Sequence, residues 1–142
     1  MSDVFIDTNV LLRVFNEEAG FEDTIEDIAE IKSNGNDLNI SCITHFELLW
    51  GYYLYARGSD FLEKYENVRN VLEIGIVDLA EEDAEVASMR CRSKNKIRDY
   101  FIASTVKNRG GSLLTYNVVD FRWIENVYTP HQFLMGKENT GQ

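Results

Sequence analysis

The sequence predicts an α/β fold with a mainly parallel sheet. Short apolar stretches rich in β-branched residues alternate with longer stretches of helical periodicity, and the chain contains a single proline and no long linker. With 142 residues, of which 44% are hydrophobic, the chain has the size and composition of one globular domain. We therefore expect one domain over residues 1–135 and a polar tail over residues 136–142.

The first half of the chain alternates strand and helix patterns. The predicted elements are a strand over 4–6, a helix from 7–9, a helix over 21–31, a strand over 38–43, a helix opening at Thr44 and a helix ending near Glu73. Asp7, Thr8 and Asn9 favour helix starts. Residues 21–31 place apolar side chains at helical spacing with acids on the other side, which predicts an acidic amphipathic helix.

The second half repeats this alternation. We expect a short strand over 74–79, helices over 81–92 and 97–109, a strand over 112–116, a turn over 117–121 and a last strand over 127–129. Gly110 and Gly111 follow the second of these helices and are typical of a helix C-cap. Strands separated by helices are typical of a parallel sheet.

The charge and the cysteine content limit the possible classes of function. The formal net charge is −10, from 14 Lys and Arg against 24 Asp and Glu, which argues against a general basic surface for nucleic acid. The distribution is uneven, since residues 90–109 hold seven cations and one acid, a segment charge of +6 that leaves −16 elsewhere. Two cysteines, Cys42 and Cys91, are too few for a disulfide framework and suggest a reducing compartment.

The beginning of the chain has no basic region and is interrupted by Asp7 and Arg13, so we expect no signal peptide. The longest mostly apolar stretch, residues 48–56, is far shorter than the ~20 residues needed to span a bilayer. These features predict a cytoplasmic protein without a membrane partner.

Four acids are expected at one edge of the sheet, because ligand sites of parallel sheets lie beyond the carboxyl ends of the strands. Asp7 follows the first strand, and Asn117 and Asp120 follow the strand over 112–116. Glu47 and Asp99 lie in the first turns of helices that begin near the same edge. Four carboxylates in one place require a compensating cation, and oxygen ligands suit Mg²⁺ or Mn²⁺.

Each of these residues also has a structural interpretation. Asp7 caps a helix, Thr44 and Glu47 fit a capping box, and Asp99 favours the positive end of a helix dipole. Asn117 and Asp120 are common turn residues. The spacing alone leaves both interpretations open.

Four sequence blocks resemble, in this order, the signature blocks of PIN domains. The blocks are residues 5–12, 41–47, 99–104 and 114–121, and they are most similar to the small single-domain group that includes VapC-type toxins. The resemblance implies a three-layer α-β-α sandwich and a Mg²⁺- or Mn²⁺-dependent endoribonuclease.

Site residues follow from the resemblance position by position. It implies that Asp7, Glu47 and Asp99 are the three central acids and catalytic metal ligands, and that Asp120 is an additional one. It further implies supporting roles for Thr8, Asn9, Thr115 and Asn117. The chain departs from the family pattern at Tyr116, where Arg is common, and at Asn117, where many relatives have Asp. Both departures affect the position of a second metal ion more than that of the first.

RNA and protein partners are expected on the same basis. The side chains expected to hold RNA phosphates beside Asp99 are Arg90, Arg92, Lys94, Lys96 and Arg98. The alternative is that they cap a helix end and coat a solvated surface. Trp50, Tyr52, Tyr53 and Tyr55 crowd one helix, which indicates core packing, a homodimer face or base stacking.

Three functions remain open. The leading hypothesis is the toxin of a toxin–antitoxin pair, with an antitoxin protein as partner. The alternatives are a housekeeping RNA-processing nuclease and a non-catalytic module that binds RNA or protein, the latter favoured by Asn117 and by the negative charge outside residues 90–109. A phosphatase with an aspartyl nucleophile is disfavoured, because such enzymes need a second Asp two residues after Asp7 and position 9 is Asn.

Overall fold

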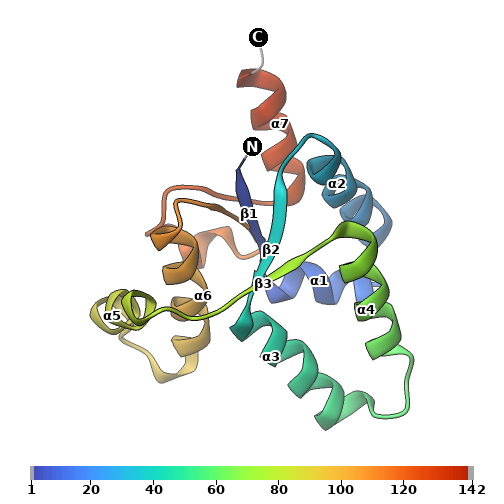
Figure 1. The fold of residues 1–142 in the computed structure, drawn as a ribbon, viewed down its shortest axis with the longest axis horizontal. Coiled ribbons are helices and arrows are strands. Elements are labelled where there is room, and N and C mark those ends of the chain that lie inside the picture. Colours follow the sequence, from blue (N-terminus) through green and yellow to red (C-terminus); the bar gives the residue numbers. More distant parts are fainter. Residues whose placement is uncertain (1, 141–142) are drawn as a thin grey trace.

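A five-stranded parallel sheet forms the centre of the computed structural model, which describes residues 2–140 (Figure 1). The strands are β1 (Asp3–Ile6), β2 (Asp37–Ser41), β3 (Gly75–Val77), β4 (Ser112–Leu114) and β5 (Val127–Tyr128). Their order is β3-β2-β1-β4-β5, and all four neighbouring pairs run parallel. The predicted α/β class with a parallel sheet is confirmed.

Helices cover both faces of the sheet. They are α1 (Thr8–Phe15), α2 (Phe21–Ser33), α3 (Cys42–Gly51), α4 (Phe61–Leu72), α5 (Glu81–Arg90), α6 (Ile97–Asn108) and α7 (Pro130–Thr140), with short helical turns η1 (Tyr52–Ala56), η2 (Lys94–Lys96) and η3 (Val118–Phe121). In Figure 1, α5 and α6 lie on one side of the strands, and α1, α2 and α4 lie on the other. Helix α7 packs against α2 and adds Phe133 and Leu134 to the core on that side. This is the expected three-layer sandwich.

Two hydrophobic cores follow from the alternation of side chains along the strands. Val4 and Ile6 of β1 pack into the first core, beneath α1, α2, α4 and α7. Phe5 points the other way, into the second core with Ile102 and Val106 of α6. Because β1 is buried on both faces, its three apolar residues form a continuous run in the sequence.

Helix α6 is anchored to its neighbours at a buried acid and at its end. The Asp83 carboxylate on α5 accepts hydrogen bonds from Thr105 Oγ1 and Asn108 Nδ2 of α6, each at 2.8 Å. After α6 the chain turns through Gly110 at φ +66°, as expected of a C-cap. A Cβ on Gly111 would lie 2.9 Å from the carbonyl oxygen of Asp3, so only glycine allows this close approach to β1.

Several element boundaries differ from the sequence prediction. The helix expected to open at Thr44 begins at Cys42, because the Ser41 side chain caps it by accepting from the Ile43 N–H at 3.1 Å. Helix α5 ends at Arg90 rather than at residue 92. Strands β3, β4 and β5 are shorter than predicted, since each is limited to the residues that pair with a neighbour.

Helix α7 was not predicted. Thr129 and Gln132 form a reciprocal cap at its start, since Thr129 Oγ1 accepts from the Gln132 N–H and Gln132 Oε1 accepts from the Thr129 N–H. The helix covers residues 136–140 of the expected polar tail, and residues 141–142 lie outside the described part. Over residues 2–140, no helix has the length and apolar character needed to cross a membrane.

Candidate active site

Asp7 occupies the carboxyl end of β1, between the two neighbouring strands β2 and β4. Its Oδ1 atom accepts from the Thr8 N–H at 2.9 Å, so it is the N-cap of α1, as the structural interpretation required. Its Oδ2 atom accepts from Thr115 Oγ1 at 2.9 Å, and the residue is only 5% exposed. One carboxylate therefore caps a helix and also lies at the candidate site.

The environment of Asp7 disfavours its charge. Burial raises the pKa of the Asp7 carboxyl to about 6, and the negative charges of Asp99 and Glu47 act in the same direction. Hydrogen bonds from Thr115 and Thr8 lower the pKa and offset part of this increase. At neutral pH the site holds a buried anion that a nearby cation would stabilise.

Glu47 points from α3 to the same place. Its Oε1 atom accepts from Thr8 Oγ1 at 2.6 Å, and its Oε2 atom accepts from Arg98 Nε at 2.9 Å. The capping box predicted for Thr44 and Glu47 is wrong, because Ser41 caps α3. Thr44 is instead fully buried inside the helix, with its hydroxyl 3.2 Å from that of Thr8.

Asp99 and Asp120 complete the acidic group. Asp99 lies in the first turn of α6, where a carboxylate is favoured by the helix dipole. Burial raises the pKa of the Asp99 carboxyl, and so do the charges of Glu47 and Asp120, against the opposite effect of Lys96 and Arg98. Asp120 Oδ1 lies 3.5 Å from Lys96 Nζ. These mutual effects indicate that the four acids share one electrostatic environment.

Thr115 connects the expected supporting residues. Its hydroxyl donates to Asp7 and accepts from Asn9 Nδ2 at 3.2 Å and from the Asn117 N–H at 3.0 Å. Asn9 Oδ1 in turn accepts from the Tyr116 N–H at 3.2 Å. Thr8, Asn9 and Thr115 thus contact the acids or one another through side chains, whereas the Asn117 side chain is exposed and the residue contributes its backbone N–H.

The carboxylates do not form a ready-made metal cage. Within the described residues, no group of three or more His, Cys, Asp or Glu side chains is placed to hold a metal ion. Two acids are paired with basic side chains instead, Glu47 with Arg98 and Asp120 with Lys96. The donors nevertheless fit a hard divalent cation, because all are carboxylates and the most buried one has a raised pKa.

The five cations expected to bind phosphates are all exposed, but their contacts differ. Arg98 and Lys96 are directed into the acidic group. The Arg90 guanidinium lies 5.3 Å over the ring of Trp123, and Arg92 Nη1 donates to the Cys91 carbonyl at 2.9 Å. Lys94 makes no ion pair within the part of the chain that the structure describes.

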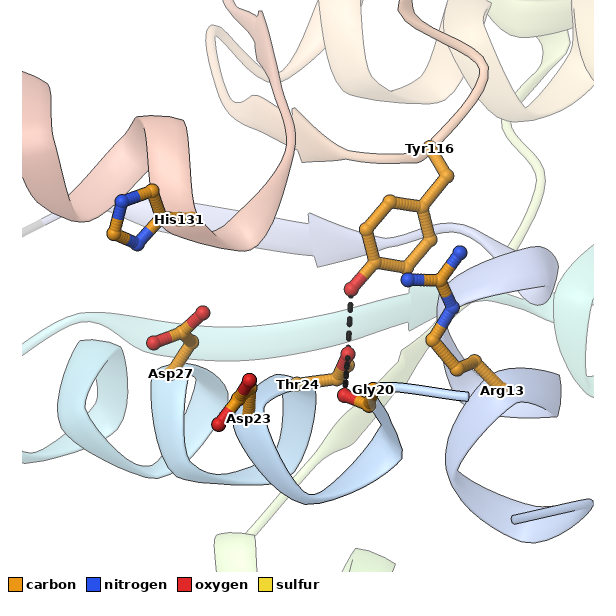
Figure 2. Close-up of a pocket in the computed structure, with 7 residues that line it drawn as sticks. All are labelled: Arg13, Gly20, Asp23, Thr24, Asp27, Tyr116 and His131. Atoms are coloured by element: carbon orange, nitrogen blue, oxygen red, sulfur yellow. Dashed lines mark hydrogen bonds between the residues drawn. The ribbon is translucent and has the colours of Figure 1, made fainter. Parts of the chain in front are cut away.

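A cavity of about 440 Å³ borders Tyr116, the residue after Thr115, and was not predicted. It is lined by Arg13, Gly20, Asp23, Thr24, Asp27, Tyr116 and His131 (Figure 2). The Arg13 guanidinium lies 3.7 Å from the centre of the Tyr116 ring, and the Tyr116 hydroxyl is 2.6 Å from Thr24 Oγ1. Tyr116, one of the departures from the family pattern, is thereby held by a guanidinium that α1 supplies.

The fold is similar to chains in solved toxin–antitoxin complexes. One is VapBC2 from Rickettsia felis bound to a promoter DNA fragment, with a TM-score of 0.68 and 18% identity over 89% of this chain and 96% of that chain. A chain of a toxin–antitoxin complex from Klebsiella pneumoniae has a TM-score of 0.63 and 26% identity, over 89% of this chain and 97% of that chain. A chain of VapBC-1 from nontypeable Haemophilus influenzae has a TM-score of 0.66 and 17% identity, over 91% of this chain and 98% of that chain.

No curated protein sequence matches this chain significantly. The sequence model of the PIN domain matches residues 4–123, a range that runs from the second residue of β1 to beyond β4 and contains all four candidate acids. The chain therefore belongs to the PIN domain family.

Proposed function

We propose that this protein is a metal-dependent endoribonuclease and the toxin of a toxin–antitoxin pair. The observation that supports this most strongly is the buried Asp7 carboxylate at the carboxyl end of β1, whose pKa is raised by burial and by the charges of Asp99 and Glu47. PIN domains are generally nucleases, which supports hydrolysis of phosphodiester bonds. The similar solved chains come from toxin–antitoxin complexes, which supports an antitoxin as partner and a cytoplasmic location.

The metal ligands in this proposal are Asp7, Glu47, Asp99 and Asp120, and the ion is Mg²⁺ or Mn²⁺. The ion would lower the pKa of a bound water for attack on the phosphate and neutralise negative charge on it. Arg98 contacts Glu47, and Lys96 contacts Asp120. Both cations therefore lie where the phosphates of an RNA held at the acids would pass.

The chain's own residues set the geometry for this chemistry. Thr115 and the Thr8 N–H hold the two oxygens of Asp7 in fixed directions, and the Thr8 hydroxyl holds Glu47. Asn9 orients Thr115 and supports the peptide after it. No side-chain nucleophile is required, so the residues act by positioning carboxylates and cations around the scissile phosphate.

The two alternatives make different predictions. A housekeeping RNA-processing nuclease would have the same site, and it differs in lacking a small DNA-binding antitoxin encoded next to it. A non-catalytic binding module would have no need for four acids that share one electrostatic environment. The retained acids therefore favour catalysis.

Removal of divalent metal is expected to abolish cleavage of single-stranded RNA. The purified protein is incubated with RNA in excess EDTA, and Mg²⁺ or Mn²⁺ is then restored in excess over the chelator. We expect no cleavage in EDTA and full recovery on addition of either ion, because the four carboxylates need a cation to act together. Asp99→Asn protein, purified in the same way, controls for contaminating nuclease. Undiminished cleavage in EDTA would refute the metal-dependent mechanism.

Lys94→Glu is expected to weaken RNA binding and to reduce its salt dependence. If Lys94 contacts a phosphate, the slope of log K against log salt concentration should decrease by about 1. Lys107→Glu is the matched control, because it changes the net charge equally but lies at the other end of α6 from Asp99. Binding titrations in EDTA over a range of salt concentrations measure both variants. An unchanged slope for Lys94→Glu would exclude a phosphate contact there.

A further inference from the structure

Three aromatic residues at helical spacing leave a large apolar surface uncovered. Phe46 and Trp50 of α3 and Tyr53 of η1 are 49%, 43% and 53% exposed. Phe46 and Trp50, four positions apart on α3, lie on one side of that helix, and Tyr53 follows on the π-helical turn η1. We call these three side chains the aromatic platform.

Guanidinium groups lie against the platform at two of its rings. The Phe46 and Trp50 rings stack on each other, with centroids 5.5 Å apart and an interplanar angle of 20°. Arg98 lies 5.2 Å from the centre of the Trp50 ring, and Arg57 lies 5.5 Å from the centre of the Tyr53 ring. The surface therefore combines exposed π-faces with fixed positive charge.

The platform is directly connected to the candidate active site. Arg98, which lies against Trp50, donates through Nε to Glu47 Oε2 at 2.9 Å. Glu47 is the neighbour of Phe46 in the chain, and its other oxygen is bound by Thr8, next to Asp7. Arg98 therefore bridges one of the acids and the Trp50 ring, so a polymer held at the acids would lie next to the platform.

We infer that the aromatic platform stacks an unpaired base of single-stranded RNA next to the phosphate that is cleaved. The aromatic rings suit the face of any base, and the guanidiniums of Arg98 and Arg57 suit the phosphates on either side. This inference rests on the proposed function, because it takes the acidic group as the place where RNA is cut.

A second copy of the chain is the competing occupant of this surface. Aromatic rings with adjacent guanidiniums occur at protein–protein interfaces as well as at base-stacking sites, so the choice of RNA rests on the contact with the acids and on the sign of the local charge. The chain as a whole has a net charge of −10, so these exposed cations beside the platform are a local exception that suits a polyanion. Self-association through these rings is the competing outcome of the test.

Tryptophan fluorescence tests the stacking without any cleavage. The chain has two tryptophans, and Trp123→Phe leaves Trp50 as the single reporter while keeping an aromatic ring against Tyr100. An adenosine oligoribonucleotide of about eight nucleotides is titrated in EDTA, alongside an abasic oligomer with the same number of phosphates. We expect the adenosine oligomer to quench Trp50 saturably and the abasic oligomer to leave its fluorescence unchanged.

Variants then separate stacking from charge. Trp50→Ala should weaken binding of the adenosine oligomer by about tenfold or more and leave binding of the abasic oligomer unchanged, and Trp50→Phe should restore most of the loss. Tyr55→Ala is the matched control, because Tyr55 is an 88% exposed aromatic on η1 that stacks neither on Phe46 or Trp50 nor against Arg98 or Arg57 in the described residues. Tyr55→Ala should bind both oligomers as the unmodified protein does.

Three results would overturn the inference. The first is that the adenosine oligomer does not quench Trp50. The second is that Trp50→Ala binds both oligomers with the same affinities as the unmodified chain. The third is that Trp50→Ala changes only the mass of the protein in sedimentation and not its RNA binding. The last result would assign the platform to self-association. Metal-dependent cleavage is measured separately, so a chain that cleaves RNA but does not stack it refutes the platform alone, and a chain that stacks RNA without cleaving it refutes the nuclease alone.

Discussion

Asp7→Asn is expected to reduce metal-dependent RNA cleavage at least about a thousandfold while the protein stays folded. The substitution removes a negative charge from the most buried acid of the group and replaces a metal-binding oxygen by a weaker amide ligand. The fold should persist, because the amide keeps the size of the side chain and its oxygen can still accept from the Thr8 N–H that starts α1.

The initial rate of cleavage of single-stranded RNA measures this effect. Asp37→Asn is the matched control, since Asp37 is an exposed acid at the amino end of β2, at the opposite edge of the sheet from Asp7. We expect Asp37→Asn to retain full activity. A rate for Asp7→Asn within tenfold of the unmodified protein would exclude Asp7 as an essential ligand.

The same Asp7→Asn variant is expected to unfold less readily than the unmodified protein at about pH 7.5 without metal. The pKa of the Asp7 carboxyl is about 6 in the folded protein, above the ordinary value of 3.8, so folding disfavours the ionised form. The stabilising effect of the protonated carboxyl is complete below pH 3.8 and is lost as the pH rises through 6. Asparagine carries no charge and escapes this loss.

The free energy of unfolding of Asp7→Asn is expected to exceed that of the unmodified protein by about 1–3 kcal/mol at neutral pH. The difference in the pKa of Asp7 between the folded and unfolded states corresponds to about 3 kcal/mol, and the weaker hydrogen bond of the variant reduces this gain. Denaturant unfolding in EDTA at about pH 7.5 and pH 4 measures it, and the gain should nearly disappear at the lower pH. Adding Mg²⁺ should stabilise the unmodified protein and not the variant. A variant less stable than the unmodified chain at pH 7.5 would show that the hydrogen bonds of Asp7 outweigh its desolvation.

The position of the acidic group was predictable because it depends on topology. Strands β1 and β4 were recognisable as apolar runs, and Asp7 follows one of them directly while Asp120 follows the other through a short turn. Parallel strands end at one edge of a sheet, so side chains that follow them must come together. Glu47 and Asp99 were expected at the same edge because they lie on helices predicted to begin there, and the order of the four family blocks supported the same four acids.

The contacts that hold the acids were not predictable from local patterns. Arg98 and Glu47 are 51 residues apart in the chain, and their contact depends on how α3 and α6 are placed around the sheet. The contact between Arg13 and Tyr116 depends in the same way on the placement of α1 beside β4. Spacing in the sequence has no information on such pairs, because the fold alone brings them together.

Two errors had signals in the sequence. Ser41 and Thr44 are both good helix caps, and burial of Thr44 inside α3 decides in favour of Ser41. The Thr129-Pro130-His131-Gln132 stretch has the spacing of a capping box with proline at the first helical position, and it predicts the start of α7.

The two-core architecture has a consequence for how mutations reach the site. Asp7 directly follows β1 in the sheet, whereas Asp99 is held by α6, which packs on the sheet through the second core. The distance between these two acids is therefore set by the packing of α6 on the sheet. A substitution that expands or contracts the second core shifts one acid relative to the other, so the tolerance of this protein to mutation in that core should be narrower for activity than for folding.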